Sequence, residues 1–141
     1  MEITEDYVSF EVAKLLKEKG FYQDFFNEIT PVWKLNGNKE ELAFYGDDNY
    51  PCEWEEWYSA PTLHMACKWL RKEHNLYVSP TYRCFCGSKK NDKPYYKWED
   101  RVLILPSGNQ VHPQIYGIHE YYETYEGAIE AACLYVLKNL I

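Results

Sequence analysis

The end of the chain constrains the fold more than any other part. After Thr124, apolar residues recur at three- and four-residue spacing through the segment YEGAIEAACLYVLKNL. They are Tyr125, Ala128, Ile129, Ala132, Cys133, Val136, Leu137 and Leu140. This period predicts an α-helix with a broad apolar face, and the Thr124 hydroxyl is suited to cap its first free amides. A face this broad must be buried, so Ile129, Cys133, Val136 and Leu137 are expected in the core.

Two earlier segments have the same helical period. The first begins after Ser9 as the cap and runs through FEVAKLLKEK to Gly20, a residue commonly needed where a helix ends. The second is predicted to begin at Ser59-Ala60-Pro61, because proline suits a first helical turn, and to stop at Asn75.

Aromatic and β-branched runs between these helices predict strands. They cover residues 31–35, 41–45, 76–85, 95–105 and 111–122, and the first two flank the turn signal Asn36-Gly37. The predicted order is therefore α, ββ, α, βββ, α. Short connections favour a mainly antiparallel sheet with helices packed on one face, in a single α+β domain spanning residues 1–141.

Charge and cysteine usage exclude several classes of function. The net charge is −7, and the lysines and arginines concentrate in residues 68–101, so binding to duplex DNA is disfavoured. The start of the chain resembles no secretory signal, and no apolar run is long enough to span a membrane, which predicts a cytoplasmic protein. There are five cysteines, and Cys67 and Cys133 fall at apolar helix positions, as reduced core thiols do.

Residues 40–58, the acidic aromatic segment, interleave carboxylates with large rings. No lysine or arginine occurs from Leu42 to Cys67. Rings supply contact area at low conformational cost and a negative field attracts a basic partner. The segment therefore predicts a binding site for a protein with a basic or amphipathic surface, although the same rings could face inward. The expected site residues are Tyr50, Glu53, Trp54, Glu55, Glu56, Trp57 and Tyr58, with at least one indole exposed beside the carboxylates.

Signals for catalysis or metal binding are weak. Cys84 and Cys86 form a Cys-x-Cys pair upstream of His112 and His119, but structural zinc sites usually place two to four residues between paired cysteines. Cys52, Cys84 or Cys86 could be paired with a histidine as a nucleophile, yet no hydrolase signature surrounds them. No phosphate-binding glycine loop or HExxH motif occurs. We therefore predict no metal, no cofactor and a non-enzymatic binding module.

Two other functions remain open from the sequence. One is a small enzyme with a cleft lined by tyrosines. The other is an accessory protein for single-stranded nucleic acid, in which rings stack on bases and lysines contact phosphates. Its residues would be Tyr82, Tyr95, Tyr96 and Trp98 with Lys89, Lys90, Lys93 and Lys97.

Residues 9–21, 59–78 and 121–141 resemble three blocks found in small uncharacterised proteins encoded by phages, prophages and other mobile elements of intestinal anaerobic bacteria. The blocks cover the three predicted helices. The family has no established activity, so the resemblance implies no catalytic residues. It implies an accessory protein that acts by binding a host or phage component.

Overall fold

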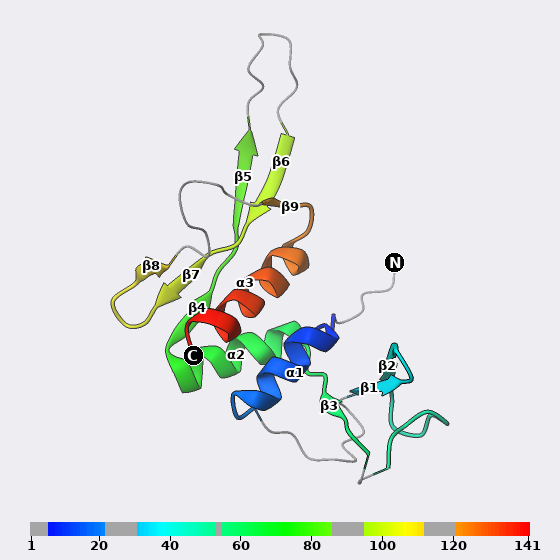
Figure 1. Cartoon of the computed structure of the whole chain (residues 1–141). Helices are drawn as coiled ribbons and strands as arrows, with labels where there is room; N and C mark the ends of the chain where they lie inside the picture. Colours follow the sequence, from blue (N-terminus) through cyan, green and yellow to red (C-terminus); the bar gives the residue numbers. More distant parts are fainter. Residues whose placement is uncertain (1–5, 22–30, 53–54, 86–94, 112–120) are drawn as a thin grey trace.

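The chain folds around three helices, with nine strands in the part that is described. The computed structural model describes residues 6–21, 31–52, 55–85, 95–111 and 121–141 (Figure 1). The helices are α1 (Phe10–Glu18), α2 (Leu63–His74) and α3 (Tyr125–Asn139). The strands are β1 (Val32–Asn36), β2 (Lys39–Ala43), β3 (Tyr58–Ser59), β4 (Leu76–Val78), β5 (Thr81–Phe85), β6 (Tyr95–Glu99), β7 (Val102–Ile104), β8 (Asn109–Val111) and β9 (Tyr121–Tyr122).

Each helix begins at a hydroxyl cap. The side chains of Ser9, Thr62 and Thr124 accept hydrogen bonds from the third amide that follows, at 3.3, 3.2 and 3.0 Å. The caps of α1 and α3 are those predicted. α2 starts later than predicted, because Ser59 belongs to β3 and pairs with Val32. Its end at Asn75 is confirmed, and this residue has the left-handed φ of 55°.

The antiparallel α+β architecture is confirmed, but the strands form three sheets instead of one. Their orders are β2-β1-β3, β4-β7-β8 and β5-β6-β9. Each of the long strands predicted over residues 76–85 and 95–105 is divided in two, at Ser79-Pro80 and at Asp100-Arg101. Proline offers no amide proton to a ladder, and Arg101 closes the break by donating to the Ser79 carbonyl at 3.1 Å. The β5–β6 hairpin therefore projects away from the helices as a separate sheet (Figure 1).

α3 lies at the centre of the core. It contacts α1, α2, β4, β6 and β9. The predicted burial of its face is confirmed, since Val136 and Leu137 are 0% exposed, Cys133 1% and Ile129 7%. α1 is also attached to α3 by a polar bond, because the Ser9 amide donates to Glu130 Oε1 at 3.1 Å.

Candidate functional site

Tyr58, the last ring of the acidic aromatic segment, belongs to the core. It is 8% exposed and packs edge-on against Phe10 of α1, with ring centroids 5.4 Å apart. Its hydroxyl donates to Glu56 Oε1 at 2.5 Å. That hydrogen bond, together with burial, raises the pKa of Tyr58 to about 12. Tyr58 therefore contributes to stability and presents no ring to a partner.

Cations from distant parts of the chain reach the same segment. Lys17 of α1 places its ammonium 4.9 Å from the Trp57 ring centroid and donates to the Trp57 carbonyl at 2.8 Å. Lys34 of β1 lies 3.6 Å from Glu55. The segment is free of basic residues in sequence, but the fold brings two of them onto it and reduces its negative field.

The remaining predicted residues differ in position. Tyr50 is half-buried and packs edge-on against the exposed Tyr45, with centroids 5.5 Å apart. Glu56 is exposed, whereas Glu53 and Trp54 lie outside the described residues. The assignment of a partner to this segment stays a prediction.

A row of rings lies on one face of the β5–β6 hairpin and continues onto α3. Tyr82 is paired with Trp98 across the two strands, and Tyr96 follows on the same face because side chains alternate along a strand. Tyr82 stacks on Tyr96 with centroids 5.3 Å apart and lies 4.7 Å from Trp98, which in turn meets Tyr125 at 5.0 Å. We call Tyr96, Tyr82, Trp98 and Tyr125 the ring row. Tyr82 and Tyr96 are 55% and 50% exposed, so the ring row is an aromatic surface open to solvent.

The described cations of the hairpin lie on its other face. Arg83 forms an ion pair with the buried Glu99. Lys97 lies 2.7 Å from Glu123. Alternation points these two side chains away from the ring row, so neither accompanies its rings as a phosphate-binding cation would; Lys89, Lys90 and Lys93 lie outside the described residues.

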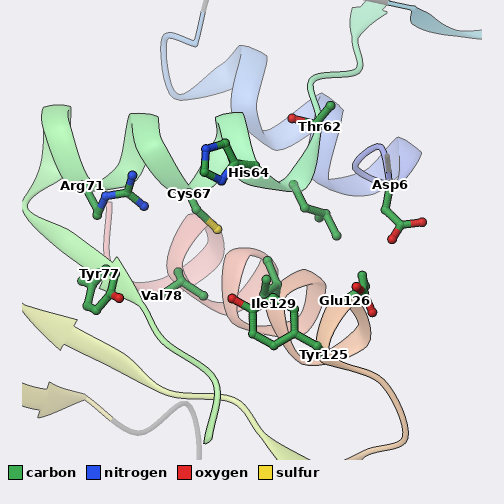
Figure 2. A pocket seen from close by; sticks show the side chains of 11 residues that line it. Asp6, Thr62, His64, Cys67, Arg71, Tyr77, Val78, Tyr125, Glu126 and Ile129 are labelled. Atoms are coloured by element: carbon green, nitrogen blue, oxygen red, sulfur yellow. The ribbon is translucent and has the colours of Figure 1, made fainter. Parts of the chain in front are cut away.

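The ring row ends at a cleft between α2, β4 and the start of α3. The cleft has a volume of about 410 Å³ (Figure 2). It is lined by Asp6, Thr62, Leu63, His64, Cys67, Arg71, Tyr77, Val78, Tyr125, Glu126 and Ile129, and we call it the α2–α3 cleft. The chain before α1 is held at its edge, because the Leu63 amide donates to the Asp6 carbonyl at 2.9 Å. The volume lies in the range of small-ligand and peptide side-chain pockets.

The two ends of the cleft carry opposite charges. Arg71 and Tyr77 lie at one end, with the guanidinium 5.9 Å from the ring centroid, while Asp6 and Glu126 lie at the other (Figure 2). Tyr125 lines the cleft and also closes the ring row. The cleft and the row therefore form one continuous surface with a charged group at each end of its hollow.

Two thiols meet at the wall of this cleft. Cys67 of α2 and Cys133 of α3 are both buried and reduced, as predicted, and are hydrogen-bonded to each other. Of the other cysteines, Cys52 and Cys84 are exposed, and Cys86 lies outside the described residues. In the described ranges, no three His, Cys, Asp or Glu side chains gather as metal ligands.

Comparisons of the chain with known protein families, with curated proteins and with solved structures found no match. No helix in the described part of the chain has the length and apolar character needed to cross a membrane.

The cleft could not be predicted from the sequence. Its residues come from four separate parts of the chain, and Arg71, Asp6 and Glu126 have ordinary sequence surroundings. The ring row left a clearer signal. Tyr82 lies on one strand, and Tyr96 and Trp98 on the next follow the two-residue alternation of a hairpin face. Their continuation to Tyr125 of α3 is a long-range contact that no local pattern contains.

Proposed function

We propose that the protein is a non-enzymatic binding module of the cytoplasm that takes a peptide segment of a partner protein into the α2–α3 cleft and along the ring row. One observation carries the proposal: an exposed row of rings ends at Tyr125, on the wall of a cleft of about 410 Å³. Tyrosine and tryptophan concentrate binding energy at protein interfaces because they bury a large area with few rotatable bonds.

The charges of the cleft define the partner segment. Arg71 offers a planar donor pair to a carboxylate, and Asp6 and Glu126 offer acceptors to an ammonium or guanidinium. Ile129 supplies apolar wall between the two ends (Figure 2), and Leu63 adds apolar lining. The segment that fits carries an acidic and a basic side chain on either side of an apolar one. The proposed partner is still the amphipathic protein expected from the sequence, but its binding site is the α2–α3 cleft instead of the acidic aromatic segment.

Peptide is favoured over single-stranded nucleic acid by charge. Two carboxylates face the cleft, the described cations of the hairpin are paired on its other face, and the whole chain carries −7. Phosphate binding needs net positive surface beside the stacking rings. The resemblance to proteins of phages and mobile elements implies that the partner is a host or phage protein.

Selection from a displayed library of random peptides on the full chain tests the proposal. Binders should share an acidic and a basic residue separated by an apolar one. Arg71→Gln and Tyr125→Ala should each weaken a selected peptide about tenfold or more, since anchors of this kind contribute about 2 kcal/mol. Lys72→Gln, at an exposed position of the same helix, and Tyr45→Ala, at an exposed ring of the acidic aromatic segment, are the matched controls and should change little.

Two results would contradict the proposal. If Tyr45→Ala abolishes binding while both cleft variants bind normally, the partner docks on the acidic aromatic segment. If an oligothymidylate binds with steep salt dependence and displaces the peptide, the ring row is a nucleic-acid platform.

A further inference from the structure

Cys67 is positioned on the cleft wall between a histidine and an arginine. His64 precedes it by three residues and Arg71 follows by four, so all three side chains lie on one face of α2 (Figure 2). Cys67 is 6% exposed and lines the cleft. This thiol therefore has a route to a small molecule in the cleft.

Cys133 stands behind Cys67 and has no such route. It is 1% exposed, on the buried face of α3. The hydrogen bond from Cys133 and the nearby Arg71 lower the pKa of Cys67 against the opposing effect of burial. The same hydrogen bond and burial raise the pKa of Cys133. The pair is therefore asymmetric: Cys67 is the thiol that ionises first, and Cys133 donates a hydrogen bond to its sulfur.

We propose that Cys67 and Cys133 form a redox-active thiol pair, in which Cys67 reacts with a small organic disulfide entering the cleft and Cys133 resolves the product. An ordinary pair of core cysteines is enclosed by apolar side chains and is inert. Here one of the two thiols faces a hollow that also holds a cation, and the other already contacts its sulfur. An accessible thiol beside a cation is what attack on a disulfide requires, and a second thiol at its sulfur is what release of the mixed disulfide requires.

The reaction has two steps that balance. The Cys67 thiolate attacks one sulfur of the disulfide RS–SR, so that a Cys67–SR bond forms and RS⁻ leaves and takes up the proton. Cys133, deprotonated in turn, then attacks the Cys67 sulfur and releases the second RSH. The protein loses two protons and two electrons, and the disulfide is reduced to two thiols.

The test uses bis(2-hydroxyethyl) disulfide and a full-length chain in which Cys52, Cys84 and Cys86 are replaced by serine. In this background, intact-mass and peptide analysis should show the Cys67–Cys133 disulfide, formed at a rate that rises linearly with reagent concentration. Adding Cys133→Ser should stop the reaction at a mixed disulfide on Cys67. Adding Cys67→Ser should slow modification of the remaining Cys133 at least tenfold, because Cys133 does not face the cleft.

A second variant pair reports on the role of Arg71. Arg71→Gln should slow the first step about threefold or more, whereas Lys72→Gln on the exposed side of α2 should not. The proposal is wrong if Cys67 and Cys133 are modified at equal rates that reach a plateau with concentration, since access then requires unfolding. It is also wrong if the unsubstituted protein, whose folding is not in question, keeps both thiols free after its exposed cysteines have reacted.

Discussion

Shortening Leu137 of α3 should destabilise the protein more than shortening Ile129 on the same helix. Both changes to alanine remove buried apolar carbon, but the sites differ. Leu137 is 0% exposed inside the core cluster, whereas Ile129 is 7% exposed and lines the α2–α3 cleft. A void left at Leu137 stays empty, while one left at Ile129 opens to the cleft and can admit water.

The magnitudes follow from this difference. Leucine to alanine removes three carbon atoms, worth roughly 0.8 kcal/mol each on transfer, and an enclosed void adds more. We expect about 4 kcal/mol for Leu137→Ala and about 2.5 kcal/mol for Ile129→Ala. Leu35→Ala, at a side chain that is 50% exposed, is the matched control and should cost under about 1 kcal/mol.

Urea unfolding followed by far-ultraviolet circular dichroism measures these losses, with the slope checked for constancy among variants. A loss below about half a kcal/mol at Leu137, or equal losses at Leu137 and Leu35, would show that α3 is not the centre of the core.

Three further predictions concern single residues. Burial raises the pKa of Glu130 above its ordinary 4.5, so the wild type loses stability as the pH rises from that value. Glu130→Gln keeps an acceptor for the Ser9 amide, so the amount by which its urea midpoint exceeds that of the wild type should grow with pH. Because the pKa of Tyr58 is raised from 10.0 to about 12, the stability advantage of the wild type over Tyr58→Phe should shrink as the pH rises between those values. If thermal scans show the same advantage across this pH range, the hydrogen bond to Glu56 is contradicted. Asn75→Ala should lower stability by about 1 kcal/mol, whereas Asn75→Gly should not, because the residue has a left-handed φ of 55°.

The helices were predictable because their signals are local. A hydroxyl cap and an apolar stripe lie within a few residues of each other, as they do from Thr124 onward, and Asn75 gives α2 a left-handed stop. The start of α2 was misplaced because Pro61 is equally suited to the residue before a cap, and the pairing of Ser59 with Val32 is a long-range contact that no local pattern contains.

The division of the predicted sheet into separate sheets could be predicted from the sequence only in part. Pro80 marks the first interruption, but the second, at Asp100-Arg101, is set by the partner strand that must bend with it. Sequence periodicity reports the face of a strand and not which sheet the strand joins.

The binding surface depended most on long-range structure. The local run of acids and rings in residues 40–58 suggested a surface, yet Lys17 and Lys34 come from α1 and β1 to meet it, and Tyr58 turns inward. Conversely, Asp6, Arg71 and Glu126 become neighbours of one hollow only through the packing of α2 on α3.

The most direct test of the account is a map of where a selected peptide contacts the folded protein. Amide resonances of the ¹⁵N-labelled chain, followed during titration with that peptide, report each backbone position separately. We expect shifts along α2, β4, the first turn of α3 and the ring-bearing strands β5 and β6, and no comparable shifts in residues 31–59. Shifts confined to residues 31–59, with α2 and the start of α3 unchanged, would contradict it.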